Sequence, residues 1–206
     1  MKAGRLFILV EGNDDQRFFS RVIRPLFLHE YTSVELISYA SMKSAKVCRY
    51  IKGLTAMHYD FIVVADIDQE PTVHHKKKVL MARFCNLHPD RVMVIVKEIE
   101  SWYLAGLDDH GSAVIGVRRL EHTDFLTKEL FNRWIPRQYN SRIAFMIECL
   151  QYFSIPVAME KNKSFHYFMR HYHLAEGKGQ VRLPATERTR SPDESRGLLQ
   201  TGETEK

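Results

Sequence analysis

Carboxylates directly follow three apolar, strand-length segments of the sequence and are its strongest chemical signal. In order, they are Glu11 after residues 6–10, Asp66 and Asp68 after residues 60–65, and Glu98 and Glu100 after residues 91–97. In a parallel α/β sheet the carboxyl ends of the strands lie along one edge, where ligands bind. Clustered carboxylates repel one another, so we expect a cation among them. Hard oxygen ligands favour Mg²⁺ or Mn²⁺.

The elements that must position these carboxylates alternate between strand and helix patterns. Residues 60–65 and 91–97 are nearly continuous apolar runs, as expected of strands buried on both faces. With further strand patterns at 6–10 and 33–38, and helical spacing in 14–27, 41–54 and 71–86 between them, the order is βαβαβαβ. This order predicts an α/β fold with a Rossmann-like parallel sheet of about four strands and right-handed crossovers.

Local spacing suggests how single carboxylates are presented. Asp66 and Asp68 are two apart, so they share one face if the strand continues through Asp66. The alternative is a solvated strand end, with Asp68 capping the next helix. Gly12 after Glu11 would let the chain turn tightly. Asp15 lies one helical turn from Glu11 and is expected to face the same crevice.

Two spacings leave the geometry open. Glu98 and Glu100 share a face if the strand continues through Ile99, and they diverge if a helix begins at Glu98. Asp14 is expected to be a helix cap, and Trp102 is expected to pack in the core.

After Glu100 the sequence changes from alternating strands and helices to helices alone. Helical patterns occupy 124–135, 141–153 and 164–172, and Gly, Pro, Ser, Thr and mixed charges dominate from residue 177. We expect an α/β domain over 1–107, a helical extension over 108–175 packed on it, and a disordered tail over 176–206.

The composition indicates which cellular compartment and which kinds of partner to expect. The 206 residues are 45% hydrophobic and 27% charged, and no apolar run is long enough to span a membrane. Three scattered cysteines show neither zinc-ligand spacing nor a disulfide framework, so we expect a reducing cytoplasm and no membrane partner. The net charge of +5 suits a nucleic-acid partner as well as it suits an ordinary basic protein. The oligomeric state stays open.

A basic run lies beside the expected acidic edge. It contains Lys76, Lys77 and Lys78, which follow two histidines on a predicted helix. These lysines could bind nucleic-acid phosphates, and they could equally form a solvated helix face.

The carboxylate pattern resembles the TOPRIM domain of topoisomerases, primases and OLD (overcoming lysogenization defect) nucleases. The resemblance covers residues 6–104 and rests on Glu11-Gly12 with a following Asp, and on Asp66-Ile67-Asp68 after the third strand. The segment from Glu98 to Leu104 resembles the acidic turn of the OLD nucleases.

The resemblance implies metal-assisted hydrolysis of phosphodiester bonds in DNA or RNA. In this reading the catalytic residues are Glu11, Asp15, Asp66, Asp68, Glu100 and Lys163, with Lys161 an alternative to Lys163. The metal ligands for Mg²⁺ or Mn²⁺ are Glu11, Asp66, Asp68, Glu98 and Glu100. By the same analogy the chain would be the nuclease subunit of a phage-defence system with a separately encoded ATPase, because it contains no P-loop of its own.

Other functions fit the sequence less well. A topoisomerase would need further domains, and a primase is expected to carry a zinc-binding cysteine pattern. A receiver domain would need a fifth strand followed by a lysine. In a haloacid-dehalogenase-type phosphatase the nucleophilic Asp follows the first strand, whereas Asp66 follows the third. A non-catalytic module that binds metal or nucleic acid and depends on a partner ATPase remains the alternative to a nuclease.

Overall fold

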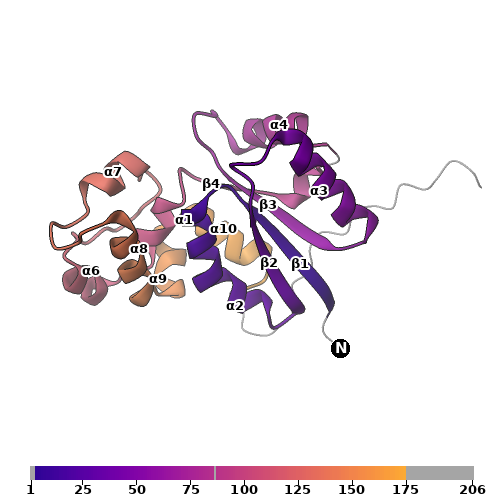
Figure 1. Cartoon of the computed structure of the whole chain (residues 1–206). Coiled ribbons are helices and arrows are strands. Elements are labelled where there is room, and N and C mark those ends of the chain that lie inside the picture. Colours follow the sequence, from indigo (N-terminus) through magenta and orange to yellow (C-terminus); the bar gives the residue numbers. More distant parts are fainter. Residues whose placement is uncertain (1–2, 86, 175–206) are drawn as a thin grey trace, which may run out of the picture.

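The computed structural model describes residues 3–85 and 87–174, which contain a four-stranded parallel sheet. Its strands are β1 (Ala3–Val10), β2 (Tyr31–Ser38), β3 (Asp60–Asp66) and β4 (Val92–Ile95), in the spatial order β2-β1-β3-β4 (Figure 1). Ile8 of β1 pairs with Leu36 of β2 and Ile62 of β3, and Val64 of β3 pairs with Met93 of β4. The predicted α/β fold with a Rossmann-like parallel sheet is confirmed.

The strands form because their apolar residues can be buried on both faces of the sheet. On β1, Leu6, Ile8 and Val10 enter one hydrophobic core, whereas Phe7 and Leu9 enter a second core on the opposite face. Such double burial explains why β3 and β4 are continuous apolar runs rather than alternating ones. Carboxylates are therefore excluded from the buried middle of β1, β3 and β4, and they follow where these strands end.

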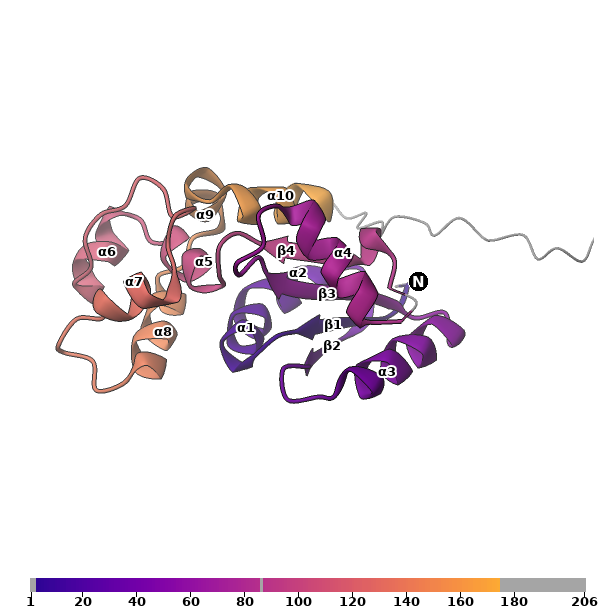
Figure 2. The ribbon, with the colours of Figure 1, turned by 90° about the horizontal axis from the view of Figure 1, so that it is seen from above.

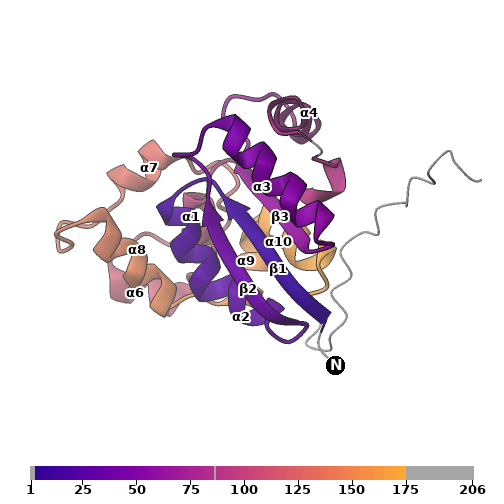
Figure 3. The ribbon, with the colours of Figure 1, turned by 45° about the vertical axis from the view of Figure 1, so that its right-hand side comes forward.

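Helices cover both faces of the sheet (Figures 1 and 3). One face packs against α3 (Ser44–Ala56) and α4 (Val73–Arg83), which contribute Val47, Ile51 and Leu80 to its core. The predicted positions of these two helices, 41–54 and 71–86, are confirmed apart from their ends.

On the other face, the helix predicted over 14–27 is an interrupted one. It consists of α1 (Asn13–Phe18), a π-helical turn, η1 (Phe19–Ile23), and α2 (Arg24–Phe27). Pro25 explains the interruption, since its ring lacks an N–H and crowds the carbonyl one turn earlier, which the wider π-helical turn accommodates. The chain thus stays helical through the proline.

The second half of the described chain is helical, as predicted. Figure 2 shows most of its helices gathered on one side of the sheet, around α5. They are α5 (Glu100–Ala105), α6 (Asp109–Ile115), α7 (Lys128–Arg133), α8 (Arg142–Gln151), α9 (Ile155–Lys161) and α10 (Lys163–His171). A short 3₁₀ turn, η2 (Pro89–Arg91), precedes β4. The sequence patterns did not predict α6 or α9, although Asp108 caps α6 and a proline opens α9.

Aromatic packing joins these helices to the sheet. Trp102 of α5 is fully buried, with its ring centroid 5.6 Å from that of Phe18 and 5.0 Å from that of Phe165. Its indole N–H donates a hydrogen bond of 2.8 Å to the Ser164 hydroxyl. Trp102 is therefore a core residue, as predicted, and it fixes α5 beside the carboxyl ends of the strands.

Two further predictions concern the limits of the chain. The expected tail over 176–206 lies outside the described residues, and the boundary predicted after residue 107 falls between α5 and α6. Among the helices of the described residues, none is both long enough and apolar enough to span a membrane.

Candidate active site at the carboxyl ends of the strands

The end of β1 presents two of the predicted carboxylates. The Tyr39 hydroxyl lies 3.2 Å from Oε1 of Glu11 and 2.9 Å from the Val64 carbonyl oxygen, so it ties Glu11 to the neighbouring strand. The Gly12 N–H donates a 3.0 Å hydrogen bond to Oδ2 of Asp15 at the N-terminus of α1. Asp15 is only 4% exposed. Asp15 therefore lies near Glu11, whose charge acts on it.

The glycine in this motif is not required by the backbone. Gly12 is extended, with φ −135°, and an added Cβ would meet Oδ2 of Asp15 at an ordinary 3.6 Å. The chain does bend at Glu11 and Gly12 between β1 and α1, but it does so in a conformation that any residue can adopt. Asp14, expected to be a cap, instead pairs with Arg17 at 2.6 Å.

The two aspartates after β3 separate from each other. Asp66 is the last residue of the strand, and Asp68 follows with φ 52°, in the left-handed region, so the extended geometry that would put both on one face ends at Asp66. Asp68 is exposed and pairs with Nζ of Lys76 at 2.5 Å. The same Nζ lies 4.0 Å from Oε1 of Glu11.

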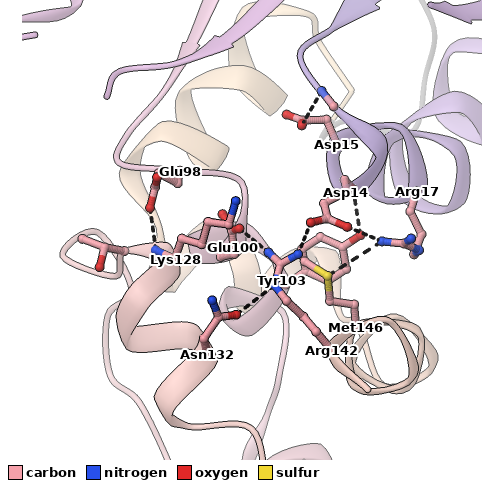
Figure 4. Close-up of polar contacts among 12 residues, drawn as sticks. Asp14, Asp15, Arg17, Glu98, Glu100, Tyr103, Lys128, Asn132, Arg142 and Met146 are labelled. Atoms are coloured by element: carbon pink, nitrogen blue, oxygen red, sulfur yellow. Dashed lines mark hydrogen bonds and ion pairs between the residues drawn. The ribbon is translucent and has the colours of Figure 1, made fainter. Parts of the chain in front are cut away.

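The segment after β4 places its two glutamates in different surroundings (Figure 4). The backbone N–H of Lys128, in the first turn of α7, donates to Glu98. Glu100 begins α5, is 3% exposed, and points to the guanidinium of Arg142. Of the two alternatives left open by the sequence, the divergent one is observed.

Arg142 is the residue of the site that the sequence did not reveal. From the first turn of α8 its guanidinium pairs with both Glu100 and Asp14, and its Nε donates a 2.9 Å hydrogen bond to Asn132 (Figure 4). Arg142 and Asp14 are 128 positions apart, and only the packing of the helical extension brings them together. The sole sequence signal was the position of Arg142 directly after Ser141, which caps α8.

Burial and mutual repulsion raise the pKa of several of these carboxyl groups. Burial, reinforced by the charges of Asp15, Glu11 and Glu100, raises the pKa of Asp66 to about 10. Burial and the neighbouring Glu11 raise that of Asp15 to about 7. Burial also raises the pKa of Glu11 and of Glu100, although Lys76 and Arg142 respectively oppose the increase. The groups are close enough to repel one another, so their ionisation demands compensating positive charge.

Two sets of carboxylates can be distinguished by their hydrogen bonds. The inner carboxylates, Asp15, Asp66 and Glu100, each have a buried oxygen without a hydrogen-bond partner among the described residues. The outer carboxylates, Glu11, Asp68 and Glu98, each receive a contact from Tyr39, Lys76 or the Lys128 backbone. Because buried polar atoms are nearly always paired, the three unpaired oxygens need an explanation.

A divalent cation would satisfy those oxygens. The donor set consists of carboxylates, which suit Mg²⁺ or Mn²⁺. Among the described residues, no three His, Cys, Asp or Glu side chains already converge into a group able to hold a metal ion. The residues therefore fit the ion in chemistry and burial, and binding would require their side chains to rotate toward one another.

The structure separates the predicted lysines. Lys76 is 6% exposed and turned toward the acidic side chains, Lys77 donates a 2.9 Å hydrogen bond to the Pro89 carbonyl, and Lys78 is exposed. Lys163 lines a cavity of about 550 Å³, and its backbone N–H bonds Asp124; among the described residues its side chain forms no ion pair with the carboxylates. Nζ of Lys161 donates to the Leu107 carbonyl at 2.6 Å.

Fold and site together define a class: a parallel α/β protein with carboxylates gathered where its strands end and with a helical extension that supplies an arginine to them. No known family profile matches the sequence. No curated protein gives a significant match either.

Solved structures similar to this chain come from OLD proteins. The C-terminal region of the Burkholderia pseudomallei OLD protein is 17% identical, with a TM-score of 0.47, and the match covers 81% of this chain and 96% of that one. The C-terminal region of the Xanthomonas campestris pv. campestris OLD protein is 17% identical, with a TM-score of 0.39 and coverage of 82% and 97%. These are partial similarities of structure, and they assign no activity to this chain.

Proposed function

We propose that this protein is a metal-dependent nuclease that hydrolyses phosphodiester bonds in DNA or RNA. The observation that carries the proposal is the set of inner carboxylates, whose buried oxygens lack partners and whose repulsion favours an added cation. A site that is strained without a cation is typical of catalytic centres rather than of structural ion pairs.

The proposal gives each side chain a task. Asp66, Asp15 and Glu100, with Glu11, would hold Mg²⁺ or Mn²⁺. The bound ion would supply an activated water and charge stabilisation at the leaving oxygen. Arg142 positions Glu100 through a charged hydrogen bond.

The outer carboxylates and the lysines have supporting tasks. Asp68 and Lys76 neutralise each other at the rim of the site, and release of Lys76 would free Asp68 for a second ion. Glu98 would contribute to the same second site. Lys77 and Lys78 remain proposed contacts for nucleic-acid phosphates, and Lys163 remains a proposed catalytic residue that would stabilise the reacting phosphate.

We further propose that the chain acts with a separately encoded ATPase, as a nuclease subunit in defence against phage. This part of the proposal rests on the motif resemblance. It predicts that cleavage by the chain alone is slow and that the partner accelerates it.

The proposal is tested by incubating the full chain with plasmid, single-stranded DNA and RNA, in Mg²⁺ or Mn²⁺ and in chelator. We expect cleavage only with metal, and we expect Glu11→Ala and Asp66→Ala/Asp68→Ala to lose it. Asp109→Ala is the matched control, because Asp109 is an exposed carboxylate paired with Arg119 in the helical extension.

Two results would contradict the proposal. Cleavage that persists in the Asp66→Ala/Asp68→Ala variant would place the active site elsewhere. A folded protein that binds Mn²⁺ but cleaves none of the substrates, even with a partner ATPase, would instead be a non-catalytic binding module.

A further inference from the structure

Two cysteines that are distant in sequence meet on the face of the sheet covered by α3 and α4 (Figures 1 and 3). Cys48 belongs to the second turn of α3, and Cys85 follows the end of α4. Their sulfur atoms are 2.6 Å apart, although 37 positions separate them in the chain. A second contact joins the same two helices, because Nε of Arg83 donates a 3.3 Å hydrogen bond to the Ser44 hydroxyl.

The surroundings of the pair favour sulfur chemistry. The Cys85 backbone N–H donates a 2.9 Å hydrogen bond to Sγ of Cys48. Hydrogen bonds from Cys85 lower the pKa of the Cys48 thiol, with a smaller contribution from Lys52. A thiol with a lowered pKa is the better nucleophile at neutral pH. Cys85 is exposed, so an oxidant in solution can reach the pair, whereas Cys149 is fully buried in the core.

We propose that Cys48 and Cys85 form a reversible disulfide when the protein meets a peroxide, so that the pair is a redox modification site. Hydrogen peroxide oxidises one thiol to a sulfenic acid and releases water. The other sulfur then attacks the sulfenic sulfur, a second water leaves, and the S–S bond forms. In sum, two thiols lose two hydrogens and one peroxide becomes two waters. A dithiol donor reverses the step by exchange.

Metal binding is the other common use of paired cysteines, and the structure offers it little support. Among the described residues, no third His, Cys, Asp or Glu joins the pair to complete a metal-binding group. The spacing of the three cysteines in the sequence shows no disulfide framework, and the pair is consistent with that, because in a reducing compartment it would remain as two thiols.

The bond would close a loop that contains much of the acidic site. Residues 49–84 include Asp66, Asp68 and Lys76, and α4 carries Lys76 at one end and leads into Cys85 at the other. Oxidation therefore ties α4 to α3 and constrains the unfolded chain. From the loop length we expect the Tm to rise by about 5–10 °C.

The test uses the full chain in chelator, treated with hydrogen peroxide and then analysed by intact mass and peptide mapping. We expect the loss of two hydrogens per chain, a cross-linked peptide joining Cys48 to Cys85, and reversal by dithiothreitol. Cys85→Ser should abolish the change. Cys149→Ser is the matched control and should leave the cross-link intact. None of these readouts depends on nuclease activity.

Several outcomes would overturn the proposal. Folded wild-type protein recovered with all three thiols free would do so. Protein with Cys149 in the cross-link, or with irreversible oxidation of Cys85 and no bridge, would also do so. A fall in Tm after oxidation would equally contradict it, because a bond that the fold accommodates should stabilise the protein. As a second comparison, oxidation of urea-unfolded protein should pair the three cysteines indiscriminately. If folded protein paired them in the same way, the contact between Cys48 and Cys85 would not direct disulfide formation.

Discussion

The inner and outer carboxylates lie at the same edge of one sheet, yet the protein surrounds them differently. Asp68 at the rim is exposed and faces a lysine, whereas Asp66, two residues earlier, is shielded and has an oxygen without a partner. Burial raises the pKa of Asp66 to about 10, with neighbouring carboxylates adding to the shift. Asp68 already has a cationic partner within the protein, whereas Asp66 would have to be neutralised by a proton or by a cation from solution.

This difference teaches that the acidic residues of one motif need not act alike. Asp66 and Asp68 were expected to act as a pair because they are two residues apart. The chain turns into the left-handed region at Asp68 and so divides them. We therefore expect different effects from substitutions in the two sets. Loss of an inner carboxylate should remove a metal ligand, whereas a change in the outer set should alter only the affinity for the metal.

The largest difference is expected between Asp66→Asn and Asp68→Asn. Loss of an inner carboxylate should lower metal-dependent cleavage by more than about 100-fold, since even residues that only support a ligand change activity 10–100-fold. Asp68→Asn should lower it less. The metal-free stability of Asp66→Asn should be nearly unchanged at neutral pH, because Asp66, with a pKa of about 10, is already uncharged there. Cleavage rates and thermal unfolding measured together check this, and equal losses in both variants would erase the distinction.

The pH dependence of stability is the next largest effect. In chelator, Asp15 and Asp66 have pKa values of about 7 and about 10, above the 3.8 of the unfolded chain. The folded state therefore binds more protons than the unfolded state, and its advantage is complete below pH of about 4. The free energy of unfolding should fall as pH rises from about 4 to 7 through Asp15, and further toward 10 through Asp66. The fall through Asp15 is on the order of 4 kcal/mol at most.

Urea unfolding at a series of pH values measures this dependence. The Asp15→Asn/Asp66→Asn variant should flatten it between pH of about 5 and 9. Saturating Mg²⁺ should also reduce it in the wild type, because the ion favours the ionised carboxylates. A wild-type profile no steeper than that of the double variant would show that these carboxyl groups do not have raised pKa values.

Arg142→Ala should have a smaller effect on stability. It leaves Glu100, which is 3% exposed, without its cationic partner. Because Glu100 can take up a proton instead of remaining charged, we expect a loss of about 1–3 kcal/mol, below that of a fully broken buried ion pair. Arg142→Lys should recover only part of it, since lysine cannot contact Glu100 and Asp14 through one planar group. A loss restored fully by lysine would contradict this role of the guanidinium.

Lys76→Met tests the outer set. Nζ of Lys76 occupies the position of a cation between Asp68 and Glu11, at 2.5 and 4.0 Å. Removing it should raise the affinity for Mn²⁺ by about tenfold, because the ion no longer competes with an internal positive charge. The matched control is Lys78→Met, which removes an exposed lysine from the same helix. Weaker Mn²⁺ binding in Lys76→Met alone would show that the lysine organises the site rather than competing for it.

The smallest effect is expected for Arg119→Ala. This residue pairs with Asp109 at 3.0 Å, and both side chains are largely exposed. Exposed ion pairs contribute little, so we expect a change below about 0.5 kcal/mol. Chemical unfolding of Arg119→Ala and Arg142→Ala under the same conditions would measure this change in the free energy of unfolding. A loss comparable to that of Arg142→Ala would mean that burial does not explain the difference between the two arginines.

The sequence predicted the parts of the molecule that depend on local pattern. Continuous apolar runs identified β3 and β4, and the strand ends then placed Asp66 and Glu100 at one edge. The helices α6 and α9 were missed because α6 has few apolar residues and α9 is short, so periodicity was weak in both.

The features that the sequence did not predict depend on packing between segments that are distant in the chain. Arg142 reaches Asp14 across 128 positions, and no local spacing records that approach. The basic run around Lys76 looked uniform in the sequence, yet one turn of α4 buries Lys76 and leaves Lys78 exposed. The raised pKa of Asp66 could not be predicted either, since it results from burial and from carboxylates on other elements.

The most direct test of the account is a calorimetric titration of the metal-free protein with Mn²⁺ at pH of about 7, in two buffers with different heats of ionisation. Asp66 and Asp15 must lose their protons to bind an ion, so we predict that wild-type protein binds Mn²⁺ with release of protons to the buffer. Asp66→Asn should bind far more weakly and release fewer protons. Absence of Mn²⁺ binding to the wild type, or equal affinity and proton release in the variant, would contradict the account.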